Sequence, residues 1–417
     1  MAEITASPKM RARGNQSGGS ARRLLVSCEA RPDTAPPISS VSTGTAAAVE
    51  SGAFGARRAI TVRLALALLP GPDVAFDLTP LQNGHRFRGI GTYVRGLSSR
   101  LAAQSEIPIE FWAWNDVTPL EVSPPHRLRL IRKPVMPQYR GAWLFVQLAI
   151  RRAASASSVR AVHLTDPDAV TAVRGHKLLA TVYDLIPLKE GISRRRAIAW
   201  AGYQVYLRSL PRADVLFPIS EQTATDLRNL LHVPASALVV ARPGIDMVAV
   251  PPSTKTPNPP YFLFLGGPNP NKNLGLLLDA LAMCRDLPET LRISGRWLPN
   301  QVAGLAAGLE ARGLAQRVQH LGFVASEELA GLMRDATALV IPSRDEGFGL
   351  PVGEGLAAGA VVIHTRIPVL EEVSAGAALT FEPNSAEDLA SCLRRVSGDT
   401  KLRAELRERG QARASQL

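Results

Sequence analysis

From about Val74 onward, short apolar runs alternate with segments in which apolar residues recur at helical spacing. The run Val74–Leu78 predicts a strand, and the segment after it predicts a helix whose apolar face carries Ile90, Val94, Leu97 and Leu101. The same alternation predicts strands at Lys177–Tyr183 and Asp214–Ile219, and Ser220 is a signal for the start of the next helix. Strands that alternate with helices predict parallel sheets with helices on both faces.

A proline-rich stretch over residues 246–260 interrupts this alternation. It restarts with a strand at Tyr261–Leu265, a glycine-containing loop and a helix from Leu274 to about Cys284. Further strands are predicted at Leu291–Ser294, Val318–Leu321, Ala338–Pro342 and Ala360–Ile363. The predicted fold is therefore α/β, with two doubly wound Rossmann-like domains, 60–245 and 261–417, joined by a hinge and facing a cleft that binds ligands at the carboxyl ends of the strands.

Residues 1–59 are rich in Ser, Ala, Gly, Thr and Pro and show no sustained period, which predicts a disordered or low-complexity extension. The start of the chain lacks the charged-then-apolar order of a convincing signal peptide. No apolar run reaches the length of about 20 residues that a membrane-spanning helix needs. The three cysteines are far apart without a CxxC pair, so we expect a reducing, cytoplasmic location and neither disulfides nor a zinc site.

The formal net charge of +12 is concentrated in one region. The segment from His126 to Arg212 contains sixteen Lys or Arg residues but only four Asp or Glu residues. Such a region attracts phosphate-rich partners, among them an anionic membrane surface or a diphosphate-linked substrate. A basic surface that is merely solvated is an equally valid interpretation. A nucleic-acid partner is not expected, because no aromatic-rich or helix-turn-helix signature accompanies the charge.

The most informative motif is Glu346-Gly-Phe-Gly-Leu-Pro-Val-Gly-Glu354. Glu346 falls in the loop after the strand through Val340, Pro351 fits the first position of a helix, and Glu354 lies about one turn into it. Free N–H groups at such a helix start favour a phosphate, and glycines allow the backbone to approach a ligand closely. The alternative is a glycine-rich turn with two surface glutamates.

This motif, preceded by Pro342-Ser343, resembles the retaining GT-B glycosyltransferases of family 4. The resemblance implies that Glu346 and the backbone of Gly347, Phe348, Gly349 and Leu350 contact the donor sugar and its phosphates, while Glu354 binds the ribose. The loop with Gly266, Gly267, Lys272 and Asn273 resembles the family's diphosphate loop, in which Lys272 has a catalytic role with Glu346. Asn271 stands where the family has an arginine.

The amino-terminal half carries matching segments, and the resemblance covers roughly Val74 to Leu417. Arg88, Gly89, Ile90 and Gly91 resemble a loop near the acceptor and the donor phosphates, although the glycines also suit a simple tight turn. Tyr183 and Asp184 match a segment in which the family has a histidine before the aspartate. Family members continue past a segment like Arg409–Leu417 into a crossover helix, so we expect either a truncated sequence or weakened domain closure.

The resemblance implies a retaining hexosyltransferase of cell-surface polysaccharide synthesis with a GDP- or UDP-linked donor, mannose being the candidate sugar. The expected acceptor is a saccharide or a lipid-diphosphate-linked saccharide, and the expected location is the cytoplasm or the inner face of the membrane. No cofactor and no metal are expected, because Asp166 and Asp168 spell Asp-x-Asp in the wrong domain. A nucleotide-sugar-binding pseudoenzyme stays open as an alternative. An oxidoreductase would need a Gly-x-Gly-x-x-Gly loop after a strand, which is not found.

Overall fold

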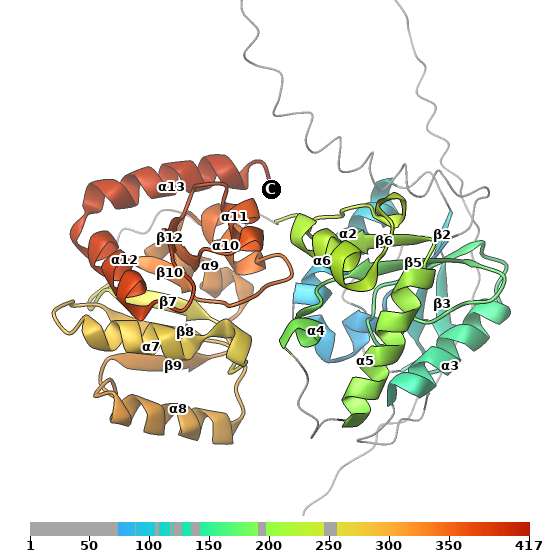
Figure 1. The fold of residues 1–417 in the computed structure, drawn as a ribbon, viewed down its shortest axis with the longest axis horizontal. Coiled ribbons are helices and arrows are strands. Elements are labelled where there is room, and N and C mark those ends of the chain that lie inside the picture. Colours follow the sequence, from blue (N-terminus) through green and yellow to red (C-terminus); the bar gives the residue numbers. More distant parts are fainter. Residues whose placement is uncertain are drawn as a thin grey trace, which may run out of the picture. The chain divides into compact units, whose positions relative to one another are not determined.

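The computed structural model describes residues 74–87, 89–104, 108–116, 120, 127–134, 142–190, 197–245 and 257–417. Within these residues the chain forms two six-stranded sheets in which every strand pair is parallel (Figure 1). Both sheets belong to one compact unit of the chain. The predicted extension 1–59 and most of the predicted hinge, residues 246–256, lie outside the described residues.

The first sheet has the strand order β3-β2-β1-β4-β5-β6. Its strands are β1 (Val74–Asp77), β2 (Ile109–Trp114), β3 (Leu128–Ile131), β4 (Ala161–Leu164), β5 (Lys177–Val182) and β6 (Val215–Pro218). The accompanying helices are α2 (Gly89–Gln104), α3 (Ala142–Ser155), α4 (Ile186–Glu190), α5 (Ala197–Ser209) and α6 (Glu221–Leu231), with the 3-10 turns η1 (Thr79–Gln82), η2 (Gly84–Phe87), η4 (Leu210–Arg212) and η5 (Ala235–Ala237). Ser220 begins α6 as predicted, because its hydroxyl accepts a hydrogen bond from the Thr223 N–H at 3.1 Å.

The second sheet has the order β12-β11-β10-β7-β8-β9. Its strands are β7 (Tyr261–Leu265), β8 (Thr290–Ser294), β9 (Val318–Gly322), β10 (Ala338–Ile341), β11 (Val362–Thr365) and β12 (Leu379–Phe381). Its helices are α7 (Leu274–Met283), α8 (Pro299–Ala311), α9 (Ser326–Asp335), α10 (Leu350–Ala357), α11 (Pro368–Ser374), α12 (Ala386–Gly398) and α13 (Thr400–Ala414), with the 3-10 turn η6 (Pro270–Lys272). Both orders are those of doubly wound Rossmann-like domains, which confirms the predicted fold class.

Buried side chains cover both faces of each strand in the second sheet's centre. Along β7, Phe262 and Phe264 pack with residues of α7 and α12, whereas Tyr261 and Leu263 pack with residues of α9, α10 and α11. Successive side chains of a strand point to opposite faces, so a strand covered by helices on both sides is apolar throughout. This is why the sequence of β7 is a continuous apolar run.

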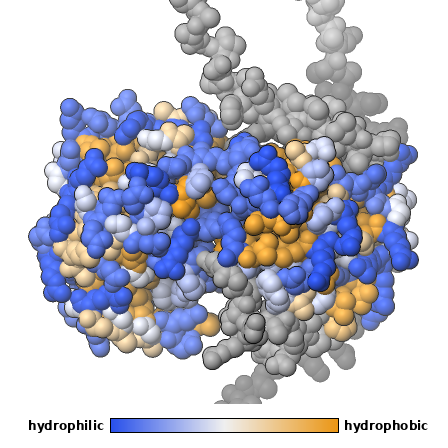
Figure 2. Space-filling view, viewed as in Figure 1, coloured by the Kyte–Doolittle hydropathy of each residue, from blue (hydrophilic) through white to orange (hydrophobic). Residues whose placement is uncertain are grey.

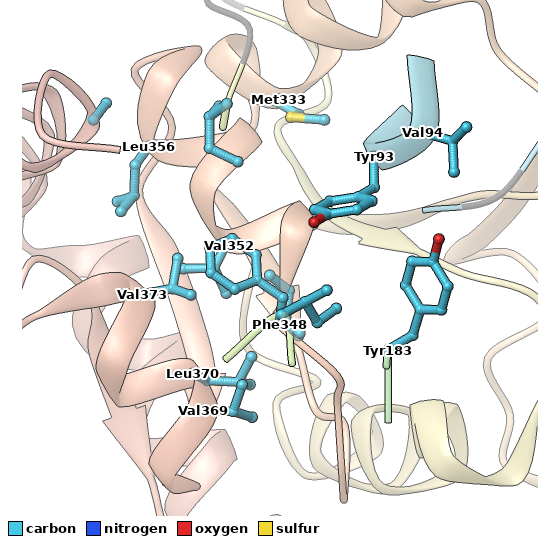
Figure 3. Close-up of a cluster of buried hydrophobic side chains, with 14 of the residues drawn as sticks. Tyr93, Val94, Tyr183, Met333, Phe348, Val352, Leu356, Val369, Leu370 and Val373 are labelled. Carbon is cyan, nitrogen blue, oxygen red and sulfur yellow. The ribbon is translucent and has the colours of Figure 1, made fainter. Parts of the chain in front are cut away.

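One core cluster contains residues of both domains. Tyr93 of α2 and Tyr183 after β5 belong to it together with Phe348, Val352 and Leu370 of the second domain (Figure 3). The rings of Tyr93 and Tyr183 meet edge to face with centroids 5.7 Å apart. This shared apolar cluster links the two domains through the loops that follow β5 and β10.

Charged side chains add a second connection between the domains. Arg242 donates to the carboxylate of Glu372 on α11 at 2.6 Å and to that of Glu221 on α6 at 2.9 Å. The Glu221 N–H donates to the second oxygen of Glu372 at 3.2 Å. Three residues that are distant in sequence therefore form one network, which the sequence pattern did not indicate.

Hydrophilic residues cover much of the face shown in Figure 2, and hydrophobic side chains form separate patches on it. Large exposed hydrophobic side chains occur on α3 and β3: Leu144, Phe145, Leu148, Leu128 and Leu130. Among the described residues, no helix combines the length and the apolar character that crossing a membrane requires.

Candidate active site

The two central loops of the second sheet follow neighbouring strands. β7 pairs with β10 at the point where the strand order reverses, and ligands of open α/β sheets bind beyond the carboxyl ends of strands at that point. Gly266 and Gly267 follow β7, and the segment from Ser343 to Gly349 follows β10. The N–H of Arg344 donates to the carbonyl of Asn271 at 2.8 Å, which ties the two loops together.

Lys272 and Glu346 lie in direct contact across these loops. The Lys272 Nζ and the Glu346 Oε1 are 2.6 Å apart, and the Ser343 hydroxyl donates to the same oxygen at 2.7 Å. Both charged side chains are largely buried, with 22% and 11% of their surfaces exposed. The predicted pair therefore meets, although the two residues are 74 positions apart in sequence.

Asn273 and Phe348 were predicted to bind the donor, and in the structure the side chains of both residues are buried. Asn273 is buried and adopts the left-handed conformation, with φ of 52°, at the start of α7. The ring of Phe348 is buried in the core cluster shared by both domains (Figure 3). Only the backbone of Phe348 is left to contact a ligand, because its side chain is committed to packing.

Glu354 lies on α10 as predicted, although the helix begins at Leu350 and places Pro351 in its second position. Gly349 precedes the helix with φ of 90°. Burial raises the pKa of Glu354. Among the described residues the Glu354 carboxylate forms no hydrogen bond or ion pair, so it does not join Glu346 and Lys272 directly.

Gly347 lies against the backbone of the loop that follows β5. A Cβ placed on Gly347 would lie 2.3 Å from the carbonyl oxygen of Tyr183. The Thr223 hydroxyl is within hydrogen-bond distance of this Tyr183 carbonyl and of the Gly347 carbonyl, at 3.3 and 3.4 Å. The sequence suggested that this glycine makes room for a ligand, and in the structure the room is taken by the protein's own backbone.

We expect Gly347→Ala to destabilise the protein by about 1–3 kcal/mol, because the new methyl group overlaps a backbone oxygen that cannot rotate away. Thermal unfolding of both proteins measures this loss. Gly331→Ala is the matched control, since nothing lies within 4 Å of its Cβ position on α9 and alanine there favours the helix. Equal melting temperatures for Gly347→Ala and the unmodified protein would contradict the close approach of these two loops.

Asp184 lies at the same junction. It is largely buried, burial raises its pKa, and the charges of Asp345 and Glu346 act on it in the same direction. Lys189 of α4 forms ion pairs with Asp345 and with Asp226 of α6. Burial disfavours the Lys189 ammonium, but these two carboxylates outweigh it and raise its pKa. Lys189, Asp226 and Asp345 were missed in the sequence because no local pattern distinguishes them from solvated charges.

Gly89 and Gly91 lie in the first turn of α2, just after the 3-10 turn η2. A Cβ on Gly91 would lie 2.5 Å from the Arg86 carbonyl oxygen, so the close packing of η2 against α2 requires glycine at this position. A Cβ on Gly89 would lie 3.0 Å from the side chain of Leu350, which brings this turn beside the loop after β10. Ile90 is partly buried against the shared core cluster. Arg88, predicted to contact phosphate, lies outside the described residues.

Comparison with protein families matches both halves of the chain. Residues 87–248 match the model described as Glycosyltransferase Family 4, and residues 250–413 match the model described as Glycosyl transferases group 1. The chain belongs to the family 4 glycosyltransferases. The predicted family is thereby confirmed.

The O-antigen chain mannosyltransferase B of Escherichia coli is similar to this glycosyltransferase, with 27% identity over 224 residues, which cover 50% of this chain and 58% of that protein. The chain spans about half the length of the curated relatives it matches.

Two solved structures share the fold of this glycosyltransferase. Sucrose-phosphate synthase from Thermosynechococcus elongatus superposes with a TM-score of 0.66 at 20% identity, covering 82% of this chain and 94% of that one. The Anabaena protein HepE, solved in complex with UDP and glucose, superposes with a TM-score of 0.64 at 17% identity, and the match covers 83% of this chain and 95% of that one. At these identities the likeness extends to the fold alone.

Proposed function

We propose that this glycosyltransferase moves a hexose from a nucleoside-diphosphate sugar to a hydroxyl group of a saccharide or lipid-linked saccharide, with retention at the anomeric carbon. The observation that carries the proposal is the contact of 2.6 Å between Lys272 and Glu346 beyond the carboxyl ends of β7 and β10. A lysine ammonium there suits a diphosphate, and a carboxylate accepts hydrogen bonds from sugar hydroxyls.

Backbone N–H groups support the same ligand. The N–H groups of Gly347, Phe348 and Gly349 donate to no atom of the described residues, and they directly precede α10. Free N–H groups at a helix start attract negative charge. Together with Lys272 they can offset the charge of a diphosphate, so we propose that the reaction needs no metal ion.

In the proposed reaction the bond between the anomeric carbon and the diphosphate oxygen breaks, and its electron pair leaves with the diphosphate. The acceptor oxygen forms its bond to the anomeric carbon on the same face, and its proton passes to the departing diphosphate oxygen. Lys272 and the three N–H groups stabilise the negative charge that develops on the leaving group. Glu346 holds Lys272 in place and accepts from the donor sugar, and Glu354 binds the ribose.

Mannose is the first donor sugar to test, because the E. coli relative is named a mannosyltransferase of O-antigen chains. Both GDP- and UDP-linked donors belong in the test, since HepE was solved with UDP. Peripheral contact with an anionic membrane stays a prediction, to be tested by vesicle flotation. The exposed Leu144, Phe145 and Leu148 of α3, followed by Arg151 and Arg152, support it.

The proposal is tested by incubating the full chain with a panel of GDP- and UDP-sugars, with and without saccharide acceptors. We expect one donor to release its nucleoside diphosphate, and NMR of the product to show the anomeric configuration of the donor. Activity should persist in EDTA. An inverted product would exclude retention, and donor binding without turnover would favour the pseudoenzyme alternative.

A further inference from the structure

The loop after β10, one of the two proposed donor loops, carries two consecutive acidic residues, Asp345 and Glu346. Glu346 contacts Lys272 of its own domain, whereas Asp345 forms an ion pair with a residue of the first domain. This residue is Lys189 of α4, whose Nζ faces the Oδ2 of Asp345. A charged side chain of one domain is therefore in direct contact with a donor loop of the other.

Asp345 connects this ion pair to the proposed donor site, because both of its carboxylate oxygens have partners. The Oδ1 accepts a hydrogen bond from the Glu346 N–H at 2.9 Å, and the Oδ2 faces Lys189. The Glu346 carboxylate in turn holds the Lys272 ammonium at 2.6 Å. Among the described residues, no other lysine or arginine forms an ion pair with Asp345. The contacts thus run without a break from α4 to the pair that carries the proposed function.

Lys189 is itself held in place by the first domain. It lies in the single turn of α4, where its N–H donates to the Leu185 carbonyl at 3.2 Å. Asp184 fixes the start of this turn by accepting from the Ile186 N–H at 3.0 Å. The Lys189 ammonium also pairs with Asp226 of α6 at 3.0 Å. A lysine held at its backbone and at its ammonium has a defined position from which it can restrain a neighbouring loop.

The surrounding charges give this ammonium a function. Asp184, Asp345 and Glu346 lie close enough that the charges of the last two act on the first. Uncompensated carboxylates repel one another, and they also repel a diphosphate. Burial disfavours the Lys189 ammonium, but Asp345 and Asp226 outweigh it and raise the pKa of Lys189, so the side chain is charged at neutral pH. Lys189 therefore offsets the charge of Asp345 as Lys272 offsets that of Glu346.

We propose that Lys189 is a positioning residue for the donor, which acts through Asp345 to hold the loop after β10 in the shape that receives the diphosphate. This inference rests on the proposed glycosyl transfer. Glu346 and the N–H groups of residues 347–349 follow Asp345 in the same loop, so a displacement of Asp345 moves all of them. A shift of about 1 Å is enough to weaken a preorganised site severely.

Arg242 offers a matched comparison, because it also joins the two domains through a pair of carboxylates. It contacts Glu372 of α11 in the second domain and Glu221 of α6 in the first. The side chains of Arg242 and Glu372 are 29% and 19% exposed, the same fractions as those of Lys189 and Asp345. Neither glutamate belongs to the loop after β10. Loss of Arg242 removes an equivalent connection between the domains and leaves the contacts of that loop in place.

Calorimetric titration of the full chain with GDP and with UDP tests the inference without turnover. We expect Lys189→Met to weaken binding of the nucleoside diphosphate about tenfold, the scale on which residues of one ion-pair network are coupled. Lys189→Arg keeps the charge and should bind nearly as tightly as the unmodified protein. Adding Asp345→Asn to Lys189→Met should weaken binding no further, because both substitutions remove the same contact. Arg242→Met should keep the full affinity, although its melting temperature should fall about as much as that of Lys189→Met.

Hydrogen exchange of the peptide that covers residues 343–354 tests the restraint in the absence of nucleotide. Exchange in this peptide should be faster in Lys189→Met and unchanged in Arg242→Met. Unchanged nucleotide affinity in Lys189→Met overturns the inference, and so does an equal loss of affinity in Arg242→Met. If the unmodified protein binds neither GDP nor UDP, the proposed function fails by itself. The exchange rates then decide whether Lys189 holds the loop, and equal rates in Lys189→Met and the unmodified protein would show that it does not.

Discussion

Glu346→Ala is expected to lower kcat by about a thousandfold, the upper end of what one preorganised polar contact contributes. The carboxylate holds the Lys272 ammonium at 2.6 Å and the Ser343 hydroxyl at 2.7 Å, so its loss leaves the lysine without a fixed position beside the leaving group. The fold should persist, because the cost is that of one ion pair and one hydrogen bond, about 1–3 kcal/mol. Steady-state kinetics with thermal unfolding measures both effects.

Glu382→Ala is the control for this variant. Glu382 also forms an ion pair, with Arg366, but both side chains are about half exposed. Its removal should leave kcat unchanged, because an exposed pair contributes little and lies outside the donor loops. Full activity of Glu346→Ala would show that this carboxylate has no part in the reaction and would remove the basis of the proposed site.

Lys272→Met is expected to lower kcat by about a hundredfold or more, because a charge that stabilises the leaving diphosphate is removed while the length of the side chain is kept. The effect should fall on kcat more than on the donor KM, since charge on the bridging oxygen grows as the bond breaks. Kinetics at saturating acceptor separates the two parameters.

Lys177→Met provides the comparison for Lys272→Met. Lys177 is the first residue of β5 and therefore lies away from the carboxyl ends of the strands. Its ammonium forms an ion pair of the same length, 2.6 Å, with Asp214. We expect it to keep full kcat. If both lysine variants lose activity equally, the loss reflects a general effect of charge on the protein and not stabilisation of a leaving group.

The alternation of strands and helices was predictable because the periodicity of apolar residues is a local property. Tyr261–Leu265 is a strand in the structure as predicted, since both of its faces are buried. The strand predicted at Ala360–Ile363 is observed at Val362–Thr365. The predicted strand did not include His364 and Thr365, because they are polar, yet both side chains are buried. The His364 ring forms a hydrogen bond with the Ser374 hydroxyl at 2.9 Å. Such a distant partner leaves no trace in the local pattern.

The sequence by itself determined the family, the order of the elements, the loops that carry Lys272 and Glu346 and the helix that carries Glu354, because motif spacing and apolar period are properties of contiguous residues. Only the tertiary structure decided which loops meet. The pairing of β7 with β10 brings Lys272 to Glu346, and the approach of the two domains commits Gly347 to the Tyr183 carbonyl and the Phe348 ring to the core. These contacts depend on strand order and long-range packing, which no local stretch of residues encodes.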